Sequence, residues 1–393
     1  MLSRKGGFSM AGRTILVLGG GIGGIVAATT LRRLLPKTHR IVLVEREIRH
    51  VFSPSLLWLM VGERLACQIS RTLSSLSRKG IELVAGTIES IDPVARVARV
   101  DGRDFAADHM IVALGAELAP ETVPGLAEAG HNFYTLDGAK SLRDARLDLK
   151  QGRIVVLVGA LPFKCPAAPY EAAFLLEADC RRRGLADRVR IDIHTPEPGP
   201  MPVAGPEVSA QIRAMVESRG IGYYPDHAVT RVDGANRRIV FANGAETGYD
   251  LLAYVPPHRA PAVVRASALA GETGWIPVDR QTLQTRFPGV HAIGDVAGIM
   301  LKMGKPLPKA GVFAHGEAEI VAHNIAAAIA GRTERRSFDG HGECFIEVGD
   351  GRAGFGRGNF YAEPAPKIRL RPPSLVLHYG KVAFEKYWLF KWF

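Results

Sequence analysis

Cysteine is scarce in this sequence. Among 393 residues there are four cysteines, Cys67, Cys165, Cys180 and Cys344, and no two of them form a C-x-x-C pair. So few cysteines in so long a chain exclude a disulfide-rich secreted scaffold, and nothing indicates a zinc site or a thioredoxin motif. We therefore expect no metal, and any cysteine chemistry must join distant parts of the chain.

Long hydrophobic runs are also missing. The most apolar stretch, residues 15–31, is interrupted by glycines and does not reach the roughly 20 apolar residues that a membrane-spanning helix needs. Arg4 and Lys5 precede this stretch, but it fits a strand, a glycine turn and a helix better than a signal peptide. We expect neither a transmembrane helix nor a cleavable signal.

Acidic residues are outnumbered. Lys and Arg total 50 against 39 Asp and Glu, a formal net charge of +11. Such an excess favours an anionic partner such as nucleic acid, acidic lipid or a phosphorylated cofactor, although a solvated basic surface would explain most of it.

The chain is long enough for two or three domains, and predicted strands and helices alternate along it, which indicates an α/β fold with parallel sheets. We expect strands at 15–18, 41–45, 110–113, 154–158 and 189–194, and helices at 22–35, 65–79, 167–183, 207–219 and 316–330. The last fifty residues show neither pattern. The alternation predicts two tandem Rossmann-like domains. The first is discontinuous and consists of 12–120 and 280–335, the second is 121–279, and a C-terminal region covers 336–393.

A glycine motif lies between the first strand and the first helix. Gly19, Gly21 and Gly24 have the G-x-G-x-x-G spacing, and Glu45 ends the next strand. These glycines permit a tight turn and close approach of a pyrophosphate to the helix N-terminus, while Glu45 can accept hydrogen bonds from a ribose. This pattern predicts a dinucleotide site.

The second unit lacks that motif. Its strand at 154–158 runs into Gly159, and then Pro162, Phe163 and Lys164 stand where a pyrophosphate would need bare backbone. A nicotinamide electron donor is therefore disfavoured.

Residues 289–295 decide between the possible dinucleotides. This segment ends in Gly294 and Asp295, and together with Gly115 it resembles the signatures of flavoproteins with two dinucleotide domains. The resemblance implies that Asp295 binds the ribityl chain of FAD and that residues 52–62, with Pro54, run beside the flavin ring. Because that segment has no cysteine, we expect noncovalent FAD.

Cys165 directly precedes a predicted helix, whose positive end would favour a thiolate, and Lys164 adds a neighbouring cation. A small buried side chain is the simpler interpretation of a lone cysteine. Cys344 could approach the flavin from a different segment. Cys67 and Cys180 lie in predicted helices away from any motif, so we interpret them as packing or surface residues.

At this point the resemblance becomes specific and covers nearly the whole chain. The run from Cys165 to Glu171, the segment around Cys344, Lys309 after Pro308, and the closing Phe-Glu-Lys-Tyr at 384–387 resemble sulfide:quinone oxidoreductases and the flavoprotein of flavocytochrome c sulfide dehydrogenase.

That resemblance implies a redox-active disulfide or polysulfide bridge between Cys165 and Cys344, a catalytic role for Glu171, and cofactor contact by Lys309. It also implies proton handling by His131 and His194. One departure is visible, because residues 117–143 lack the third cysteine that many sulfide:quinone oxidoreductases have.

The last ten residues hold six aromatics. Phe384, Trp388 and Trp392 form a stripe at helical spacing with Tyr387 beside it, and lysines including Lys381 are interleaved. Such a helix suits the interface of a membrane, and the alternative is an aromatic helix docked on the protein core. We place a quinone near Phe52, Trp58 and Lys381.

The sequence thus predicts a peripheral, monotopic enzyme of the cell membrane that oxidises sulfide to zero-valent sulfur or polysulfide and passes electrons through FAD to quinone. We expect sulfide, quinone and the lipid surface as partners, a homo-oligomer as an option, and no nucleic acid. The alternatives are a soluble sulfide dehydrogenase, a type II NADH:quinone dehydrogenase and a non-catalytic flavin-binding partner protein.

Overall fold

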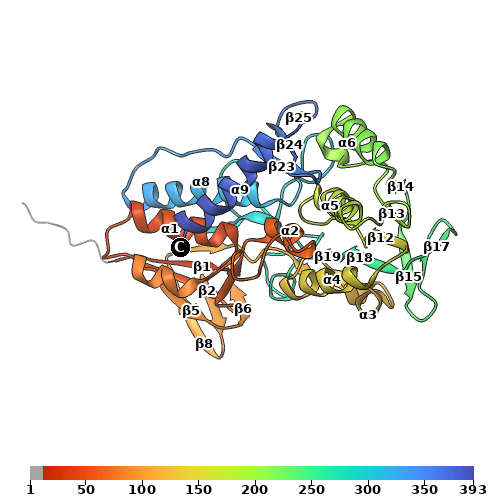
Figure 1. Cartoon of the computed structure of the whole chain (residues 1–393). Coiled ribbons are helices and arrows are strands. Elements are labelled where there is room, and N and C mark those ends of the chain that lie inside the picture. The colour runs from red at the N-terminus through yellow and green to blue at the C-terminus, as the bar shows by residue number, and fades with distance from the viewer. Residues whose placement is uncertain (1–11) are drawn as a thin grey trace, which may run out of the picture.

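The computed structural model describes residues 12–393. Arg4 and Lys5, which bear on the signal-peptide prediction, lie outside the described residues. Two five-stranded parallel sheets organise the chain, each with helices packed on it (Figure 1).

The first sheet has the strand order β21-β9-β1-β2-β5. Its strands are β1 (Thr14–Leu18), β2 (Arg40–Glu45), β5 (Glu82–Ala85), β9 (His109–Val112) and β21 (Val290–Ala292). The central strands are almost fully buried, as parallel strands covered on both faces must be. Because β21 comes from late in the chain, the sheet joins two distant segments.

Different elements cover the two faces of this sheet. Helices α1 (Ile22–Leu34) and α8 (Gly311–Ile329) pack side by side on one face, as Figure 1 shows. On the other side lies a meander of β6 (Ile88–Asp92), β7 (Val97–Val100) and β8 (Arg103–Ala106).

The second sheet has the order β11-β18-β12-β13-β14. Its strands are β11 (His131–Asn132), β12 (Gly152–Val158), β13 (Val189–His194), β14 (Gly222–Tyr224) and β18 (Leu251–Val255). Helices α4 (Leu136–Asp148), α5 (Ala168–Arg182) and α6 (Pro206–Ser218) accompany it, with a meander of β15 (Val229–Asp233), β16 (Arg238–Phe241) and β17 (Glu246–Gly248). The α/β expectation is confirmed.

The C-terminal residues are regular, which corrects the prediction that they have no pattern. They form an antiparallel sheet of β23 (His341–Glu347), β24 (Ala353–Asn359) and β25 (Lys367–Ser374), followed by helix α9 (Leu375–Lys391). Ser374 caps this helix by accepting a hydrogen bond from the Leu377 N–H. Glycines and charged residues in the strands obscure their alternation in the sequence.

The helix predicted at 65–79 is wrong. The segment contains the strand β4 (Ser70–Thr72), which pairs with β3 (Arg49–Val51), and a 3-10 helix at Leu73–Lys79. Thr72 accepts from the Ser74 N–H, and the Ser75 hydroxyl donates to the Thr72 carbonyl. Such local side-chain bonds compete with α-helical ones.

The remaining elements are short. They are α2 (Leu56–Met60), α3 (Leu126–Ala129), α7 (Ala262–Arg265), β10 (Glu117–Leu118), β19 (His258–Arg259), β20 (Ile276–Pro277) and β22 (Ala297–Gly298). Among residues 12–393, no helix combines the length and the apolar character that crossing a bilayer requires.

Candidate active site

The predicted glycine motif forms a tight turn between β1 and α1. Gly19 has a φ of +105°, and a Cβ there would lie 2.4 Å from the Ala113 carbonyl oxygen. A Cβ on Gly24 would lie 1.8 Å from the Gly19 oxygen, whereas one on Gly21 would meet open space. Gly19 and Gly24 therefore close the turn, and Gly21 leaves bare backbone toward a ligand.

Glu45 closes the same site from the end of β2. One carboxylate oxygen accepts a hydrogen bond from the Gly20 N–H at 2.6 Å, and the other accepts from the Glu47 N–H at 3.0 Å. The acid is thus fixed beside the glycine turn, where a dinucleotide places its ribose.

Gly294 and Asp295 lie beyond the end of β21, next to the start of α8. Gly294 has a φ of +71°, and its N–H donates to Glu317 at 2.6 Å. Burial raises the pKa of Asp295, and it raises that of Glu317 to about 7. The Lys309 ammonium donates to the Asp295 carbonyl oxygen, and burial lowers the pKa of Lys309 to about 8.

Gly294, Lys309 and Glu317 line a small cavity together with Ala297, Ile299, Leu307, Pro308, Ala310 and Phe313. Gly115 also has a positive φ, and a Cβ there would meet nothing within 4 Å. Bare backbone at Gly21 and Gly115, together with the fixed acid Glu45, fits a dinucleotide cofactor such as FAD.

Cys165 occupies a constrained turn ahead of α5. It has a φ of +54°, its N–H donates to the Lys309 carbonyl at 2.7 Å, and its carbonyl accepts from Ala168 at 2.9 Å. The Tyr134 hydroxyl donates to the neighbouring Lys164 carbonyl at 2.8 Å. The turn thus ties the second sheet to the Lys309 segment beside the cavity.

Cys344 approaches from β23. Its register partner on β24 is Gly356, and its thiol donates to the Phe345 carbonyl at 3.2 Å. Cys344 keeps an exposed surface, yet the protein surrounds its sulfur densely enough to raise the pKa of the thiol to about 12.

The two thiols lie within electrostatic reach of one another. Burial raises the pKa of Cys165 well above its usual value, the charges of Cys344 and Glu171 raise it further, and Lys381 lowers it. Both thiols are free in this structure. This corrects two expectations: the pKa of Cys165 is raised, not lowered, and the cation acting on it is Lys381. The Lys164 ammonium instead lies 6.0 Å from the Tyr134 ring centroid.

Glu171 and Lys381 form a buried ion pair beside both cysteines. The Lys381 ammonium donates to a Glu171 oxygen at 2.7 Å, and the same oxygen accepts from the Glu347 N–H at 2.8 Å. The Glu347 carboxylate in turn lies 3.0 Å from Nδ1 of His378. We call Cys165, Cys344, Glu171 and Lys381 the cysteine site.

Sequence analysis missed Glu347 and His378. Burial raises the pKa of Glu347, and the charges of Lys381 and His378 lower it. A signal was present only for His378, which precedes Lys381 by three residues on the predicted C-terminal helix, about one helical turn. Only the fold shows that the two side chains meet.

The contacts of the two candidate histidines involve no residue of the cysteine site. Nδ1 of His131 lies 2.8 Å from the Ser141 hydroxyl, and burial lowers its pKa. His194 is stacked between Tyr224 and Phe241, with ring centroids 4.4 and 4.9 Å away. Neither ring nitrogen of His194 has a hydrogen-bond partner. Burial lowers the pKa of His194 to about 3.

The other two cysteines take no part in the site. Cys180 is buried in α5, as expected. Cys67 is exposed and lies in a turn, because the helix predicted around it does not form.

The segment with Phe52, Pro54 and Trp58 packs against α9. Phe52 contacts the rings of Trp388 and Phe384, at centroid distances of 5.2 and 6.0 Å. Trp58 is buried, and the Lys381 ammonium lies 5.0 Å from its ring. Phe52 and Trp58 thus both contact α9, the helix that carries Lys381.

The aromatic stripe predicted on α9 is only partly correct. Trp388 and Trp392 are 2% and 1% exposed. They pack in the hydrophobic core that β1 shares with α1 and α8, so they do not face lipid. Phe384 and Tyr387 are exposed. The apolar side chains open to solvent on this helix are Leu375, Val376, Tyr379, Phe384, Tyr387 and Phe390.

Comparison with known proteins gives consistent matches. A family model described as pyridine nucleotide-disulphide oxidoreductase matches residues 13–318. The mitochondrial sulfide:quinone oxidoreductase of Mus musculus is 26% identical over 89% of this chain and 79% of its own length. The sulfide-quinone reductase of Aquifex aeolicus is 28% identical over 96% of this chain and 90% of its own. The crystal structure of the Aquifex aeolicus sulfide:quinone oxidoreductase superposes with a TM-score of 0.88 at 25% identity, covering 97% of this chain and 91% of that one.

Proposed function

This chain belongs to the pyridine nucleotide-disulphide oxidoreductase family, and we propose that it oxidises sulfide at Cys165 and Cys344 and passes the electrons through noncovalent FAD to a quinone. The observation that carries the proposal is the cysteine site. Two thiols from segments far apart in the sequence share one buried ion pair, Glu171–Lys381, and lie within electrostatic reach of each other.

The cofactor would be held by the residues already described. Gly19, Gly21 and Gly24 leave room for its pyrophosphate, Glu45 accepts from its ribose, and the segment at Gly294 and Asp295 lines the cavity beside Lys309. Bound there, FAD would accept two electrons from the sulfur centre and pass them on to the quinone.

The sulfur step uses the oxidised pair, in which Cys165 and Cys344 form a disulfide. Hydrosulfide attacks the Cys165 sulfur, a new S–S bond forms, and the electron pair of the old bond leaves on Cys344 as a thiolate. Cys165 then carries a persulfide. Over the whole reaction, hydrosulfide loses two electrons and one proton to give zero-valent sulfur, and a quinone gains those two electrons, that proton and a second proton from solvent.

Lys381 provides the charge that this step needs. Burial disfavours thiolates at both cysteines, and Lys381 is the cation that lowers both pKa values. A cation held beside the leaving sulfur stabilises the thiolate as it forms. Glu171 fixes the Lys381 ammonium in place and is itself fixed by the Glu347 N–H.

A nicotinamide donor does not fit the second unit. Phe163 is buried in the loop that would need to receive a pyrophosphate. Lys164 forms a β-bridge with Lys309, so the loop is already paired with the cavity segment.

For membrane attachment, the exposed apolar face of α9 supports a peripheral position. Val376, Tyr379 and Phe390 are 79%, 68% and 84% exposed, and they contribute apolar area that a bilayer interface would bury. The quinone would then enter from the lipid near Phe52, Trp58 and Lys381.

The experiment that tests this function is an anaerobic titration of the purified flavoprotein. Addition of sulfide should bleach the flavin absorbance, and a later addition of a short-chain quinone should restore it. A flavin that sulfide leaves oxidised, while NADH reduces it at once, would overturn the proposal.

A further inference from the structure

Part of one face of the C-terminal sheet is open to solvent, and register determines which side chains lie on it. Paired residues of antiparallel strands share a face, and Arg357 pairs with Arg369. Side chains alternate along β25, so Lys367 and Arg371 lie on the same face as Arg369. The residues between them, Ile368 and Leu370, pack against the hydrophobic core. Three cations of one strand therefore point outward together.

These cations have no acidic partners. Lys367, Arg369 and Arg371 are exposed, and none of them makes an ion pair with a carboxylate of residues 12–393. On this face the Glu343 carboxylate lies 3.9 Å from the Arg357 guanidinium. Arg357 is thus partly neutralised, and β25 remains a row of uncompensated positive charge.

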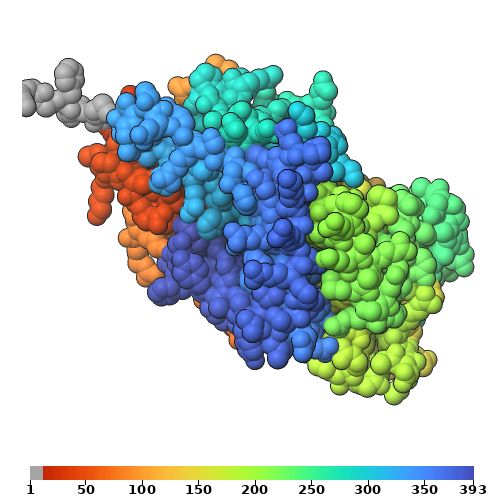
Figure 2. All heavy atoms as spheres, turned by 90° about the horizontal axis from the view of Figure 1, so that it is seen from above, coloured from red at the N-terminus to blue at the C-terminus, as the bar shows by residue number. Residues whose placement is uncertain are grey.

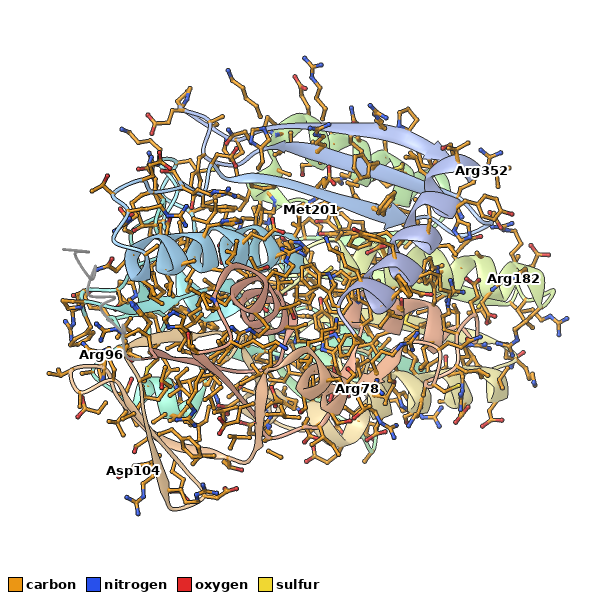
Figure 3. The ribbon with its side chains drawn as sticks, turned by 90° about the vertical axis from the view of Figure 1, so that its left-hand side faces the viewer. Arg78, Arg96, Asp104, Arg182, Met201 and Arg352 are labelled. Carbon is orange, nitrogen blue, oxygen red and sulfur yellow. The ribbon has the colours of Figure 1, made fainter. Side chains whose placement is uncertain are left out.

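The row continues directly into the apolar face of α9. Ser374 is both the last residue of β25 and the cap of the helix, and Leu375, Val376 and Tyr379 follow it as exposed side chains. Figure 3 shows the three strands as an outer layer of the molecule, with Arg352 near the turn between β23 and β24. In Figure 2 the C-terminal residues, coloured blue, form one continuous band across a single face.

We propose that this band is a docking surface for an anionic lipid bilayer, in which β25 binds lipid phosphates and α9 enters the interface. The proposal rests on the membrane attachment suggested above and adds a lipid preference to it. Charge complementarity favours acidic headgroups, and the adjoining apolar side chains favour a bilayer over a purely polar polyanion.

The size of the effect follows from the number of free cations. Each basic residue near an acidic membrane surface strengthens binding by about fivefold, so three should give on the order of 100-fold at low salt. The effect should weaken as ionic strength rises, because exposed charges are screened over about 8 Å at physiological salt.

The test is co-sedimentation of the FAD-loaded protein with two kinds of vesicle, pure phosphatidylcholine and phosphatidylcholine mixed with phosphatidylglycerol. The triple variant K367Q/R369Q/R371Q should lose most of its preference for the acidic vesicles and keep its binding to the neutral ones. The matched control K37Q/R188Q/R231Q removes three exposed cations elsewhere, so it has the same net charge and should behave like the wild type.

The outcomes separate this inference from the membrane attachment itself. Equal binding of the wild type to both vesicles, or an equal loss in the two triple variants, would overturn the role of β25. No binding to either vesicle would instead contradict the proposed attachment. The flavin content of each variant reports whether it has folded.

Discussion

The buried Lys381 ammonium donates a hydrogen bond at 2.7 Å to Glu171, a residue 210 positions earlier in the chain. The pair joins α9 to α5 beside both cysteines of the site. Because removing one partner leaves the other charged and buried, such a pair is far more sensitive to single than to double substitution.

Substitution of Lys381 by Met should therefore destabilise the protein by about 3 to 5 kcal/mol in urea denaturation, since Glu171 loses its partner. The double variant K381M/E171Q should recover much of that stability. Thiol acidity gives an independent readout: alkylation of the reduced protein should need higher pH in K381M, because the cation that lowers both thiol pKa values is gone. Unchanged alkylation would show that Lys381 does not act on the sulfurs.

Substitution of either Cys165 or Cys344 by Ser should abolish sulfide-dependent flavin bleaching and leave FAD bound, because each variant lacks half of the disulfide. The controls are Cys67→Ser, which changes an exposed residue, and Cys180→Ser. Anaerobic stopped-flow absorbance measures the rates. Retention of most of the activity in either site variant would rule out the disulfide mechanism.

The enzyme should be selective for its electron donor. We expect sulfide to reduce the flavin rapidly and NADH and NADPH to do so negligibly, because bulky residues fill the loop after Gly159. Acid precipitation should release the flavin into the supernatant if it is bound noncovalently. Flavin that stays with the precipitate would contradict that part.

The two faces of α9 should respond differently to substitution. Replacing Tyr387 and Phe390 by Ser should weaken vesicle binding and leave the free energy of unfolding nearly unchanged, because both side chains are exposed. Trp388→Ala should instead cost about 3 to 5 kcal/mol, as expected for a large aromatic in a core. Denaturation and co-sedimentation of the same two variants make the comparison, and the opposite pattern would mean that α9 is docked the other way round.

His194 offers a test of a proton-transfer role. Its pKa is lowered to about 3 in the folded protein, so the unfolded chain, with a histidine pKa near 6.5, binds more protons at acid pH. Stability should fall as pH drops below 6.5, by about 3 kcal/mol at pH 4.5 from this residue alone. His194→Phe should remove that contribution and keep quinone reduction intact, and a large loss of turnover would restore His194 as a catalytic candidate.

Local chemistry explains what the sequence predicts well. The turn at Gly19 and Gly24 is predictable because a side chain at either position would collide with the backbone, so only glycine fits. Glu45 is predictable from its place at the end of the next strand. The buried strands are continuous apolar runs that parallel sheets require. Each of these features depends on residues close together in the chain.

What the sequence does not predict depends on distant contacts. Nothing near Lys381 indicates Glu171 as its partner, and the raised pKa values of the cysteines arise from burial by several segments. On α9, spacing alone identifies an aromatic stripe but does not determine whether Trp388 faces lipid or the core. The segment at 65–79 has helical spacing, but Ser and Thr side chains bind its backbone instead.

Helix α9 cannot rotate about its own axis. On one side Lys381 is held by Glu171, and Glu385 is held by both Ser55 and Arg64. An α-helix turns by about 100° per residue, so inserting a single residue before Lys381 would turn the ion-pairing side chains away from their partners and bring exposed apolar ones toward them. Changes in chain length should therefore not be tolerated in the first half of α9, and on a bilayer the cysteine site would keep one fixed height and orientation.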